Sequence, residues 1–317
     1  MLQFMNKKLI TWVALFVVVI FAAGCGSSPA PAPKPAAPAA APAAPAIDKA
    51  AETKAAAWDG YKKVLADVSG KTFPLDPAKA KELLTGNESK YLVIDLRTAE
   101  DYAKGHIKGA VNIPLAQLPQ NLDKLPMDKT LMLYCYSGQT SSMTMVPLKQ
   151  YGYKVVSISR GFPTMEKAGF AIDTTAVAFT PVAAKAPADA KVAAGLDGLK
   201  ETLDALVKQF AAKTLIVPGK DVKTLVDAGA DKYYIVDLRA ADDYAKGYVK
   251  GAVSVPLANL ATAMKSFPKD KTIVLYCYSG QTAAMATVPL KAEGFKLISI
   301  STGFPGAQAG GFAVEKK

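Results

Sequence analysis

Two cysteines carry the clearest chemical potential in this sequence. Cys135 and Cys277 lie in the same eight-residue string, LYCYSGQT, which occurs at 133–140 and again at 275–282. A cysteine thiolate is a strong nucleophile, although free cysteine is also among the residues most often buried for packing alone. Two cysteines followed by identical loops favour a reactive role over an inert one. We expect no disulfide between them, because equivalent loops on two domains have no reason to face each other.

Each cysteine follows a short apolar run and precedes a helical segment. In the first copy the apolar run is 130–134, the loop is 135–140 and the predicted helix spans about 141–150. In parallel α/β sheets, ligands bind beyond the carboxyl ends of the strands, where the free N–H groups of helix N-termini point. Such donors stabilise a thiolate without a neighbouring base, and Gly138 lets the loop curl with no side chain inside it. The pattern predicts an anion-stabilising cup around each sulfur.

The chain is a tandem duplication. A constant offset of 142 residues relates Cys135 to Cys277 and Gly161 to Gly303, and the strings DYAKG and KGAV recur at the same offset. A period of this length is the size of a domain and far exceeds that of solenoid repeats. With 317 residues, half of them hydrophobic, the chain is long enough to bury two cores.

Short apolar runs alternate with helical segments inside each copy. In the first copy, strands are predicted at 91–96, 110–113, 130–134 and 154–159. Continuous apolar runs, without alternation of apolar and polar residues, indicate a parallel sheet that is covered on both faces. The sequence therefore predicts an α/β fold.

The predicted organisation has five segments. They are a signal peptide at 1–24, an Ala/Pro-rich tether at 25–53, domain 1 at 54–173, a linker at 174–195 and domain 2 at 196–317. Because each copy contains a full set of strands and helices, we expect the two domains to fold separately.

The N-terminus resembles a bacterial lipoprotein signal. A short basic start at 5–8 precedes an apolar run at 9–23, and a small-residue cleavage site ends in Cys25. The run is shorter than the roughly 18 to 20 apolar residues of a membrane-spanning helix, which favours a cleaved signal. Cys25 would then carry the lipid, and the tether would hold the domains away from the membrane. The resemblance implies a lipid-anchored protein of the cell envelope that faces the periplasm, with the outer membrane favoured.

The charge pattern argues against a nucleic-acid partner. The formal net charge is +11, almost all of it from lysine, since arginine occurs only at 97, 160 and 239. Nucleic-acid readout is typically built from clustered arginine and aromatic residues, and the sequence has no such cluster. We interpret most lysines as solvated helix faces, with a weak field that favours small anions or anionic lipid headgroups as the alternative.

The motifs of both copies resemble the rhodanese family. In the first copy they are Asp95-Leu96-Arg97, Asp101-Tyr102, Gly105 to Ala110, Asn112-Ile113-Pro114, the six-residue Cys135 loop and Gly161-Phe162. The resemblance covers about 75–171 and 217–313. It implies two tandem rhodanese-like domains, each a parallel five-stranded sheet flanked by helices. It also implies a cysteine that takes sulfane sulfur from a donor as a persulfide and passes it to a thiophilic acceptor.

The resemblance assigns the catalytic, persulfide-bearing role to Cys135 and Cys277. The other loop residues would form the substrate-binding cradle: Tyr136, Ser137, Gly138, Gln139 and Thr140 in domain 1, and Tyr278, Ser279, Gly280, Gln281 and Thr282 in domain 2. Ser137 and Ser279 match a loop serine of mercaptopyruvate-using relatives, which would help to move a proton.

Asp95 and Arg97 resemble the scaffold pair of the family. We expect Arg97 to bridge to Asp101, and in domain 2 Arg239 to bridge to Asp243. His106 is interpreted as structural, because domain 2 keeps an intact cysteine loop with a tyrosine in its place.

Two differences from the family pattern restrict the reactions that the chain is expected to catalyse. The loops contain none of the basic residues found in thiosulfate-using enzymes, which leaves the physiological donor open. Phosphatase relatives of the fold carry arginine six positions after the cysteine, where this chain has Ser141 and Ala283. This difference argues against oxyanion-ester chemistry.

The leading hypothesis is a sulfurtransferase that moves sulfane sulfur from thiosulfate, polysulfide or a persulfide to a thiol or cyanide acceptor. The alternatives are a low-turnover persulfide-carrying or anion-binding envelope module, and a structural lipoprotein with inert cysteines. We expect no cofactor and no metal. Since the two loops are identical in sequence, Cys135 and Cys277 are expected to be interchangeable in their intrinsic reactivity.

Overall fold

The computed structural model describes residues 59–68, 74–183 and 196–316. The predicted signal peptide, Cys25 and the tether lie outside the described residues, and so does the part of the predicted linker at 184–195. Among the described residues, no helix is long and apolar enough to cross a membrane.

Domain 1 is built on a parallel sheet in the order β3-β1-β4-β5. Its strands are β1 (Tyr91–Asp95), β3 (Val111–Asn112), β4 (Thr130–Tyr134) and β5 (Lys154–Ser157). A fifth position is occupied by a single parallel bridge between Leu75 and Ile158. The parallel α/β sheet is as predicted, with the fifth strand reduced to this bridge.

Domain 2 has a parallel sheet of five strands in the order β10-β8-β11-β12-β7. The strands are β7 (Ile216–Val217), β8 (Tyr233–Asp237), β10 (Val253–Ser254), β11 (Thr272–Tyr276) and β12 (Lys296–Ile300). Here the predicted five-stranded parallel sheet is confirmed.

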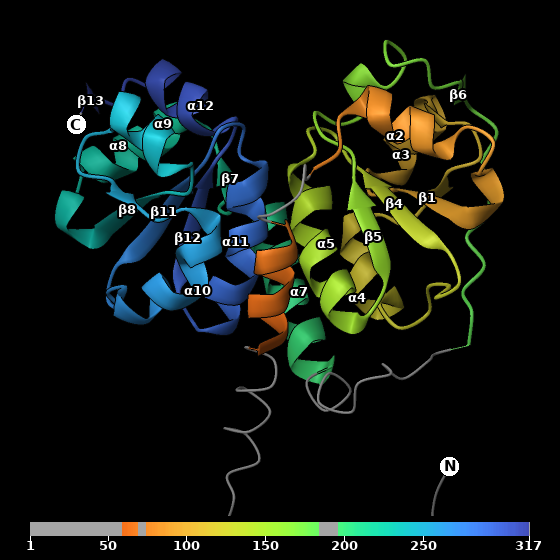
Figure 1. Cartoon of the computed structure of the whole chain (residues 1–317), viewed down its shortest axis with the longest axis horizontal. Coiled ribbons are helices and arrows are strands. Elements are labelled where there is room, and N and C mark those ends of the chain that lie inside the picture. Colours follow the sequence, from red (N-terminus) through yellow and green to blue (C-terminus); the bar gives the residue numbers. More distant parts are fainter. Residues whose placement is uncertain (1–58, 69–73, 184–195, 317) are drawn as a thin grey trace, which may run out of the picture. The chain divides into compact units, whose positions relative to one another are not determined.

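The remaining elements flank the two sheets (Figure 1). Those of domain 1 are α2 (Pro77–Leu84), η1 (Glu88–Lys90), α3 (Ala99–Lys104), β2 (His106–Ile107), η2 (Leu115–Gln117), α4 (Leu118–Asn121), α5 (Gln139–Tyr151), η3 (Phe162–Thr164) and β6 (Ile172–Asp173). Those of domain 2 are α7 (Leu196–Ala211), α8 (Gly219–Asp227), η4 (Ala230–Lys232), α9 (Ala241–Lys246), β9 (Tyr248–Val249), η5 (Leu257–Asn259), α10 (Leu260–Ala263), η6 (Met264–Ser266), α11 (Gln281–Ala292), α12 (Gly303–Ala309) and β13 (Val314–Glu315). Two short antiparallel pairs, β2 with β6 and β9 with β13, accompany the sheets.

Strand β4 shows why its apolar run has no alternation. Leu131 and Leu133 belong to the apolar cluster on one face of the sheet, while Met132 and Tyr134 belong to the cluster on the other face. Because both faces are buried, the four positions after Thr130 carry large, mainly apolar side chains. The strand ends at Tyr134, directly before Cys135, inside a covered sheet.

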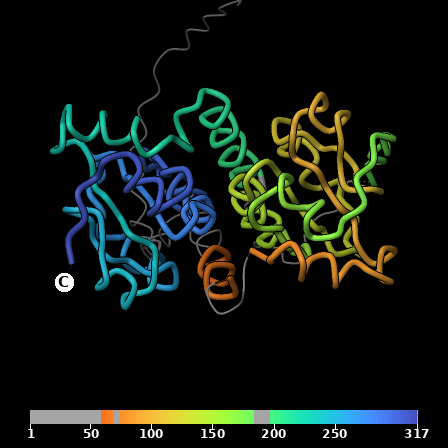
Figure 2. The backbone as a smooth tube through the Cα atoms, turned by 90° about the horizontal axis from the view of Figure 1, so that it is seen from above, coloured from red at the N-terminus to blue at the C-terminus, as the bar shows by residue number. Residues whose placement is uncertain are grey.

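The two domains meet through helices. Helix α5 of domain 1 packs against α11 of domain 2, and α7 contacts both of them as well as α4 (Figures 1 and 2). Lys200 on α7 donates to Asp123 of domain 1 over 2.8 Å. Gln209, on the same helix, donates to the carbonyl oxygen of Leu297 in domain 2 over 2.7 Å. Helix α7 is thus tied to both halves of the chain.

The helix over residues 59–68 is a second tie. Its Asp67 forms an ion pair of 2.9 Å with Lys149 on α5, and its Tyr61 hydrogen-bonds Thr202 on α7. Tyr61 and Leu65 are buried in a cluster that contains residues of both domains. One apolar cluster is therefore shared by the two domains, although each domain also has a cluster of its own on the other face of its sheet. That the two domains fold separately stays a prediction. The described part of the chain falls within one unit, 47–317.

The first part of the predicted linker packs on domain 1. Val177 forms a parallel bridge with Val111, and its N–H donates to the hydroxyl of Tyr102 over 3.0 Å. Val182 donates to the carbonyl oxygen of Lys124 over 2.9 Å. Residues 174–183 therefore extend the domain, although their composition predicts a linker.

Candidate active site

Each cysteine sits between a strand and a helix, as the sequence predicts. Cys135 follows β4, and Gly138 is the residue before α5, with a left-handed φ of 84°. The N–H of Gly138 points back and donates to the Cys135 sulfur over 3.2 Å. In domain 2, Gly280 has a φ of 87°, and its N–H donates to the Cys277 sulfur over the same distance. Glycine is required here because other residues rarely adopt this conformation.

A second glycine packs closely against the backbone of each loop. Gly161 has a φ of 65°, and a Cβ atom at this position would lie 2.2 Å from the carbonyl oxygen of Tyr136. The following residue, Phe162, donates its N–H to the carbonyl oxygen of Cys135 over 2.8 Å. Gly303 is equivalent in domain 2, where a Cβ would lie 2.3 Å from the carbonyl oxygen of Cys277. The backbone of each loop is thus held at the strand end by direct contact.

The surroundings of the Cys135 sulfur include a chain of buried hydroxyl groups. The Cys135 thiol donates to Ser141 Oγ over 3.6 Å, and Ser157 Oγ donates to Ser141 Oγ over 2.8 Å. Ser142 Oγ lies 3.2 Å from Ser157 Oγ. Ser141, Ser142 and Ser157 are all fully buried. The sulfur therefore contacts a side-chain hydroxyl in addition to the backbone.

Domain 2 lacks these hydroxyl groups. Ala283 and Ala284 replace the two helix serines, and the Ala283 N–H donates to the Cys277 sulfur over 3.4 Å. Ser299, the counterpart of the strand serine, is buried with no hydrogen-bond partner for its Oγ. The two sulfurs therefore have different neighbours, although the loops are identical in sequence. That Cys135 and Cys277 are interchangeable in intrinsic reactivity stays a prediction.

The two cysteine loops contact each other across the domain interface. Gln281 Nε2 donates to the carbonyl oxygen of Ser137 over 3.1 Å and lies beside Gly138. Gln139 Nε2 lies in the equivalent place beside Gly280, buried and without a hydrogen-bond partner. Our expectation that equivalent loops would have no reason to face each other is wrong, because the packing of α5 on α11 brings them together. Both cysteines are nevertheless free thiols.

Within each loop, the serine and glutamine side chains bond to each other. Ser137 Oγ donates to Gln139 Oε1 over 3.3 Å, and Ser279 Oγ donates to Gln281 Oε1 over 3.2 Å. The hydroxyl of Ser137 is thus bonded to the glutamine that faces the other domain. Thr140 and Thr282, the last loop residues, lie in the first turns of α5 and α11.

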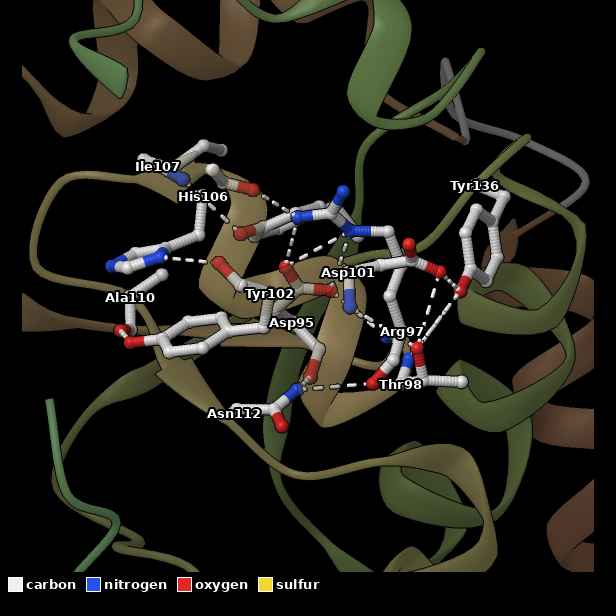
Figure 3. Close-up of polar contacts among 12 residues, drawn as sticks. Asp95, Arg97, Thr98, Asp101, Tyr102, His106, Ile107, Ala110, Asn112 and Tyr136 are labelled. Atoms are coloured by element: carbon white, nitrogen blue, oxygen red, sulfur yellow. Dashed lines mark hydrogen bonds and ion pairs between the residues drawn. The ribbon is translucent and has the colours of Figure 1, made fainter. Parts of the chain in front are cut away.

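The scaffold arginine pairs with a different aspartate from the one that we expected. Arg97 bonds to Asp95 through both Nε and Nη2, with an Nη2 to Oδ2 distance of 2.6 Å (Figure 3). The same Nη2 donates to the carbonyl oxygen of Gly105 over 2.6 Å. The predicted bridge from Arg97 to Asp101 is wrong. Both partners of the observed pair are buried, and the guanidinium stacks over Phe162 with its carbon 3.6 Å from the ring centre.

Domain 2 repeats this arrangement. Arg239 pairs with Asp237 over 2.6 Å and donates to the carbonyl oxygen of Gly247, so the predicted bridge to Asp243 is wrong as well. Its guanidinium carbon lies 3.9 Å from the ring centre of Phe304. Since Phe304 directly follows the glycine that supports the cysteine loop, the ion pair is linked to the loop through this ring.

The residue after each cysteine is an exposed tyrosine that bonds to an aspartate. The hydroxyl of Tyr136 donates to Asp101, and that of Tyr278 donates to Asp243 over 2.5 Å (Figure 3). These bonds lower the pKa of both aspartates. The tyrosines are 45% and 49% exposed, so each presents one ring face to solvent beside its loop.

A hollow of about 360 Å³ opens beside Tyr278. Its lining contains the cationic side chains of Arg239, Lys246 and Lys316 together with Asp243. Lys246 pairs with Asp243 over 2.9 Å, and Arg239 is buried with its own partner. The third cation of this lining, Lys316, takes part in neither of these two ion pairs.

These features can be compared with those of known proteins. A family model described as the rhodanese-like domain matches residues 76–168 and 219–309, which together make up more than half of the chain. The chain belongs to the rhodanese-like family. The tandem arrangement inferred from the repeat is thereby confirmed.

Three relatives of this rhodanese-like chain illustrate the range of matches. The putative sulfurtransferase YtwF of Bacillus subtilis is 33% identical over 92 residues, which are 29% of this chain and 88% of that protein. The thiosulfate sulfurtransferase PspE of Escherichia coli is 34% identical over 70 residues, 22% of this chain and 67% of that protein. The tRNA sulfurtransferase of Pyrobaculum aerophilum is 39% identical over 69 residues, which are 22% of this chain but only 14% of that protein. These three relatives are named as sulfurtransferases, and each match covers less than a third of this chain.

His106 has the structural role that its replacement in the second rhodanese-like domain suggested. Its ring is buried, stacks on Tyr102 at a centroid distance of 3.7 Å and bonds through Nδ1 to the carbonyl oxygen of Tyr102. Its Nε2 bonds to the carbonyl oxygen of Thr175. The ring thus ties the end of domain 1 to α3.

Sequence reasoning missed Ser141 and Ser157 as parts of the site. Ser141 was considered only as the position where a phosphatase would carry arginine. Comparison of the two copies contains the signal, because Ser157 is kept at 299 while the serines at 141 and 142 are alanines at 283 and 284. Among the described residues, no group of three or more His, Cys, Asp or Glu side chains is arranged to hold a metal ion.

Proposed function

We propose that the chain is a sulfurtransferase in which Cys135 and Cys277 carry sulfane sulfur as persulfides. The observation that supports this most strongly is the N–H group aimed at each buried sulfur from the start of a helix, over 3.2 Å in both domains. Such a donor stabilises an anionic sulfur, whether it is a thiolate or the terminal atom of a persulfide. The reaction needs this anion at the start and at the end of each cycle.

The proposed cycle has two balanced steps. The cysteine thiolate attacks the outer sulfur of a donor, a new S–S bond forms, and the donor leaves as sulfite or as a thiolate with the electron pair of the broken bond. The acceptor, cyanide or a thiolate, then attacks the terminal sulfur and leaves as thiocyanate or a persulfide, while the cysteine departs as a thiolate. No oxidant is consumed, because the sulfane sulfur only changes its partner.

A small anionic donor suits the surroundings of the domain 2 loop. The hollow beside Tyr278 is lined by Lys316 together with Arg239 and Lys246, which are each paired with an aspartate. A positive lining raises the local concentration of anions. Thiosulfate, polysulfide and low-molecular-weight persulfides all share this negative charge, and the loop sequence does not select among them.

A donor screen with mass spectrometry tests the proposal. The chain with Cys25→Ser is incubated with thiosulfate, polysulfide or glutathione persulfide, and the peptides of Cys135 and Cys277 are measured separately. We expect a gain of about 32 Da, one sulfur atom, on each cysteine peptide, and its loss on addition of cyanide. The Cys135→Ser/Cys277→Ser chain is the control. No gain with any of the three donors would contradict the proposal.

A low-turnover persulfide carrier is the second candidate. It is favoured by the burial of both sulfurs, which are 1% exposed and therefore poorly placed for rapid exchange with bulk solutes. Rapid formation of thiocyanate over many cycles supports the enzyme, whereas one equivalent per cysteine without further turnover supports the carrier.

We also propose that the protein is lipid-anchored at Cys25 and faces the periplasm. This rests on the sequence of the N-terminal segment, which lies outside the described residues. In that setting the acceptor would be a thiol of another envelope protein or a small thiol.

A further inference from the structure

The buried serines next to Cys135 have no role in the cycle described so far. Ser141 lies in the first turn of α5, six residues after the cysteine, with its Oγ 3.6 Å from the sulfur. Both residues are excluded from solvent, with 0% and 1% exposure. The contact is therefore made in a dry environment, where a hydrogen bond to a charged group is strong.

Two further buried serines continue the hydrogen-bonded chain from the Ser141 hydroxyl. Ser157 on β5 donates to Ser141 Oγ over 2.8 Å, and Ser142 lies 3.2 Å from Ser157. Ser141 Oγ in turn donates to the carbonyl oxygen of Gly138 over a longer distance, 3.2 Å. Because Ser157 supplies the proton that Ser141 Oγ accepts, the proton of Ser141 remains free to point to either Gly138 or the sulfur.

Domain 2 shows the same site without the serine relay, which is the hydrogen-bonded chain of Ser141, Ser157 and Ser142 in domain 1. Alanine occupies positions 283 and 284, yet Ser299 is retained with a buried Oγ that has no partner. A buried hydroxyl without a partner is uncommon and costs free energy. The orphan hydroxyl lies at the place equivalent to Ser157, where a serine at 283 would be bonded.

We propose that Ser141 is a catalytic residue of domain 1 whose hydroxyl donates a hydrogen bond to the anionic Cys135 sulfur. In the thiol form, the S–H group donates to Ser141 Oγ, as observed. When the Cys135 thiol loses its proton to water, the sulfur can only accept, and the Ser141 hydroxyl turns from Gly138 to the sulfur. No covalent bond is formed or broken in this movement. Ser157 continues to donate to Ser141, so every hydroxyl keeps a partner.

The proposal rests on the proposed function for its meaning in the cycle. Cys135 is the leaving group when the acceptor removes the terminal sulfur, and a donor at the sulfur stabilises the departing thiolate. Cys277 relies on the N–H groups of Gly280 and Ala283 alone. In domain 1 the Ser141 hydroxyl should therefore be the donor whose loss weakens the stabilisation of the Cys135 anion.

The test compares matched pairs that each contain one thiol. Cys135 is isolated in a Cys25→Ser/Cys277→Ser chain, with and without Ser141→Ala. Cys277 is isolated in a Cys25→Ser/Cys135→Ser chain, with and without Ala283→Ser. The thiolate is followed by its ultraviolet absorbance across a pH series, with the spectrum of the chain lacking all three thiols subtracted. The rate of iodoacetamide alkylation is measured over the same series.

The expected result is a pH profile that changes shape. Ser141→Ala should make the thiolate appear at higher pH and slow alkylation about threefold near neutral pH. This estimate assumes a tenfold loss of thiolate, partly offset because a less stabilised thiolate is the better nucleophile. At strongly alkaline pH, where both chains are ionised, the variant should react as fast as its parent or faster. Ala283→Ser should shift the Cys277 profile in the opposite direction.

A control and a second variant keep the outcome decisive. Thr144 lies on the same buried face of α5, but its hydroxyl donates to the carbonyl oxygen of Ser141 and not to the relay. Thr144→Val should therefore leave the profile unchanged. If Ser141→Ala slows alkylation equally at all pH values, or if its absorbance profile overlays that of its parent, Ser141 acts only in packing and the proposal is wrong. Should Ser141→Ala fail to fold, an unshifted Ala283→Ser profile overturns it by itself.

These measurements need no sulfur donor. A shifted thiolate profile without persulfide formation would support the role of Ser141 and contradict the proposed sulfurtransferase. Persulfide formation with unshifted profiles would do the reverse.

Discussion

A substitution in helix α7 tests how strongly the stability of each domain depends on the other. Leu203 on this helix is 0% exposed and lies in the apolar cluster that both domains share. Leu203→Ala removes buried methyl groups and leaves a cavity, which should lower the free energy of unfolding by about 2–5 kcal/mol. For a cooperative unit of this size, each kcal/mol lowers Tm by about 2–4 °C, so the expected fall is roughly 4–20 °C.

The two buried cysteines report the opening of each domain separately. Cys135 and Cys277 are each 1% exposed, so a bulky maleimide should label either one only after its domain opens. Pulse labelling across a urea series, followed by mass spectrometry of the two cysteine peptides, gives one unfolding midpoint per domain. We expect Leu203→Ala to lower both midpoints together, because α7 contacts helices of both domains.

An exposed leucine supplies the matched control. Leu225 on α8 is 42% exposed, so Leu225→Ala removes the same atoms with an expected change within about 0.5 kcal/mol. If Leu203→Ala moves only the Cys277 midpoint, α7 stabilises domain 2 alone and the coupling is refuted. A fragment of residues 54–175 that unfolds cooperatively, with the stability of the whole chain, would refute it independently.

Three further predictions concern the scaffold, the loop contact and the N-terminus. Arg97→Met leaves Asp95 charged, buried and unpaired, so the free energy of unfolding in urea should fall by about 3–5 kcal/mol. A fall below about 1 kcal/mol would mean that other groups stabilise the carboxylate. Gln281→Met removes the donor that domain 2 supplies to the domain 1 loop. In a chain whose only thiol is Cys135, it should change the alkylation rate of that thiol, and an unaltered rate would show that the loop holds its shape alone. Cys25→Ser should abolish the incorporation of labelled palmitate, and a variant that is still labelled would exclude Cys25 as the anchor.

The position of each cysteine could be predicted because it depends on local rules. An apolar run that is buried on both faces gives β4, and a glycine with positive φ lets the chain turn directly into α5. The helix begins at Gln139, two residues earlier than its predicted start, because Gly138 itself is the cap. Boundaries of this kind depend on cap geometry, which the apolar pattern does not record.

The partner of Arg97 was mispredicted for a local reason. Asp95 ends a strand and Arg97 follows two residues later, so both side chains leave the same face of the chain. The guanidinium folds back onto this carboxylate, while Asp101 is occupied by Thr98, Lys104 and Tyr136. Arg97 pairs with the carboxylate two residues before it in the chain. Similarity to the family pattern predicted the wrong partner.

The contact between the loops and the serine relay could not be read from either copy alone. Gln281 reaches Ser137 only because α5 packs on α11, and helix packing between domains leaves little trace in a single sequence. Ser141 and Ser157 are 16 residues apart and meet through the register of a helix on a strand. Comparison of the two copies shows the change from serine to alanine, and the structure adds that the Ser299 hydroxyl has no partner.

The reciprocal contact of the loops has an evolutionary meaning. The glutamine of each loop lies against the glycine of the other, Gln281 beside Gly138 and Gln139 beside Gly280. A surface in which residue i meets j and j meets i is the hallmark of a two-fold symmetric homodimer. The chain has the architecture of such a dimer fused into one polypeptide. In a homodimer every substitution occurs twice at the interface, whereas fusion gives each half its own codons. Serine at 141 and alanine at 283 are a divergence that only the fused form permits, so that the two sulfurs of one molecule can be tuned apart.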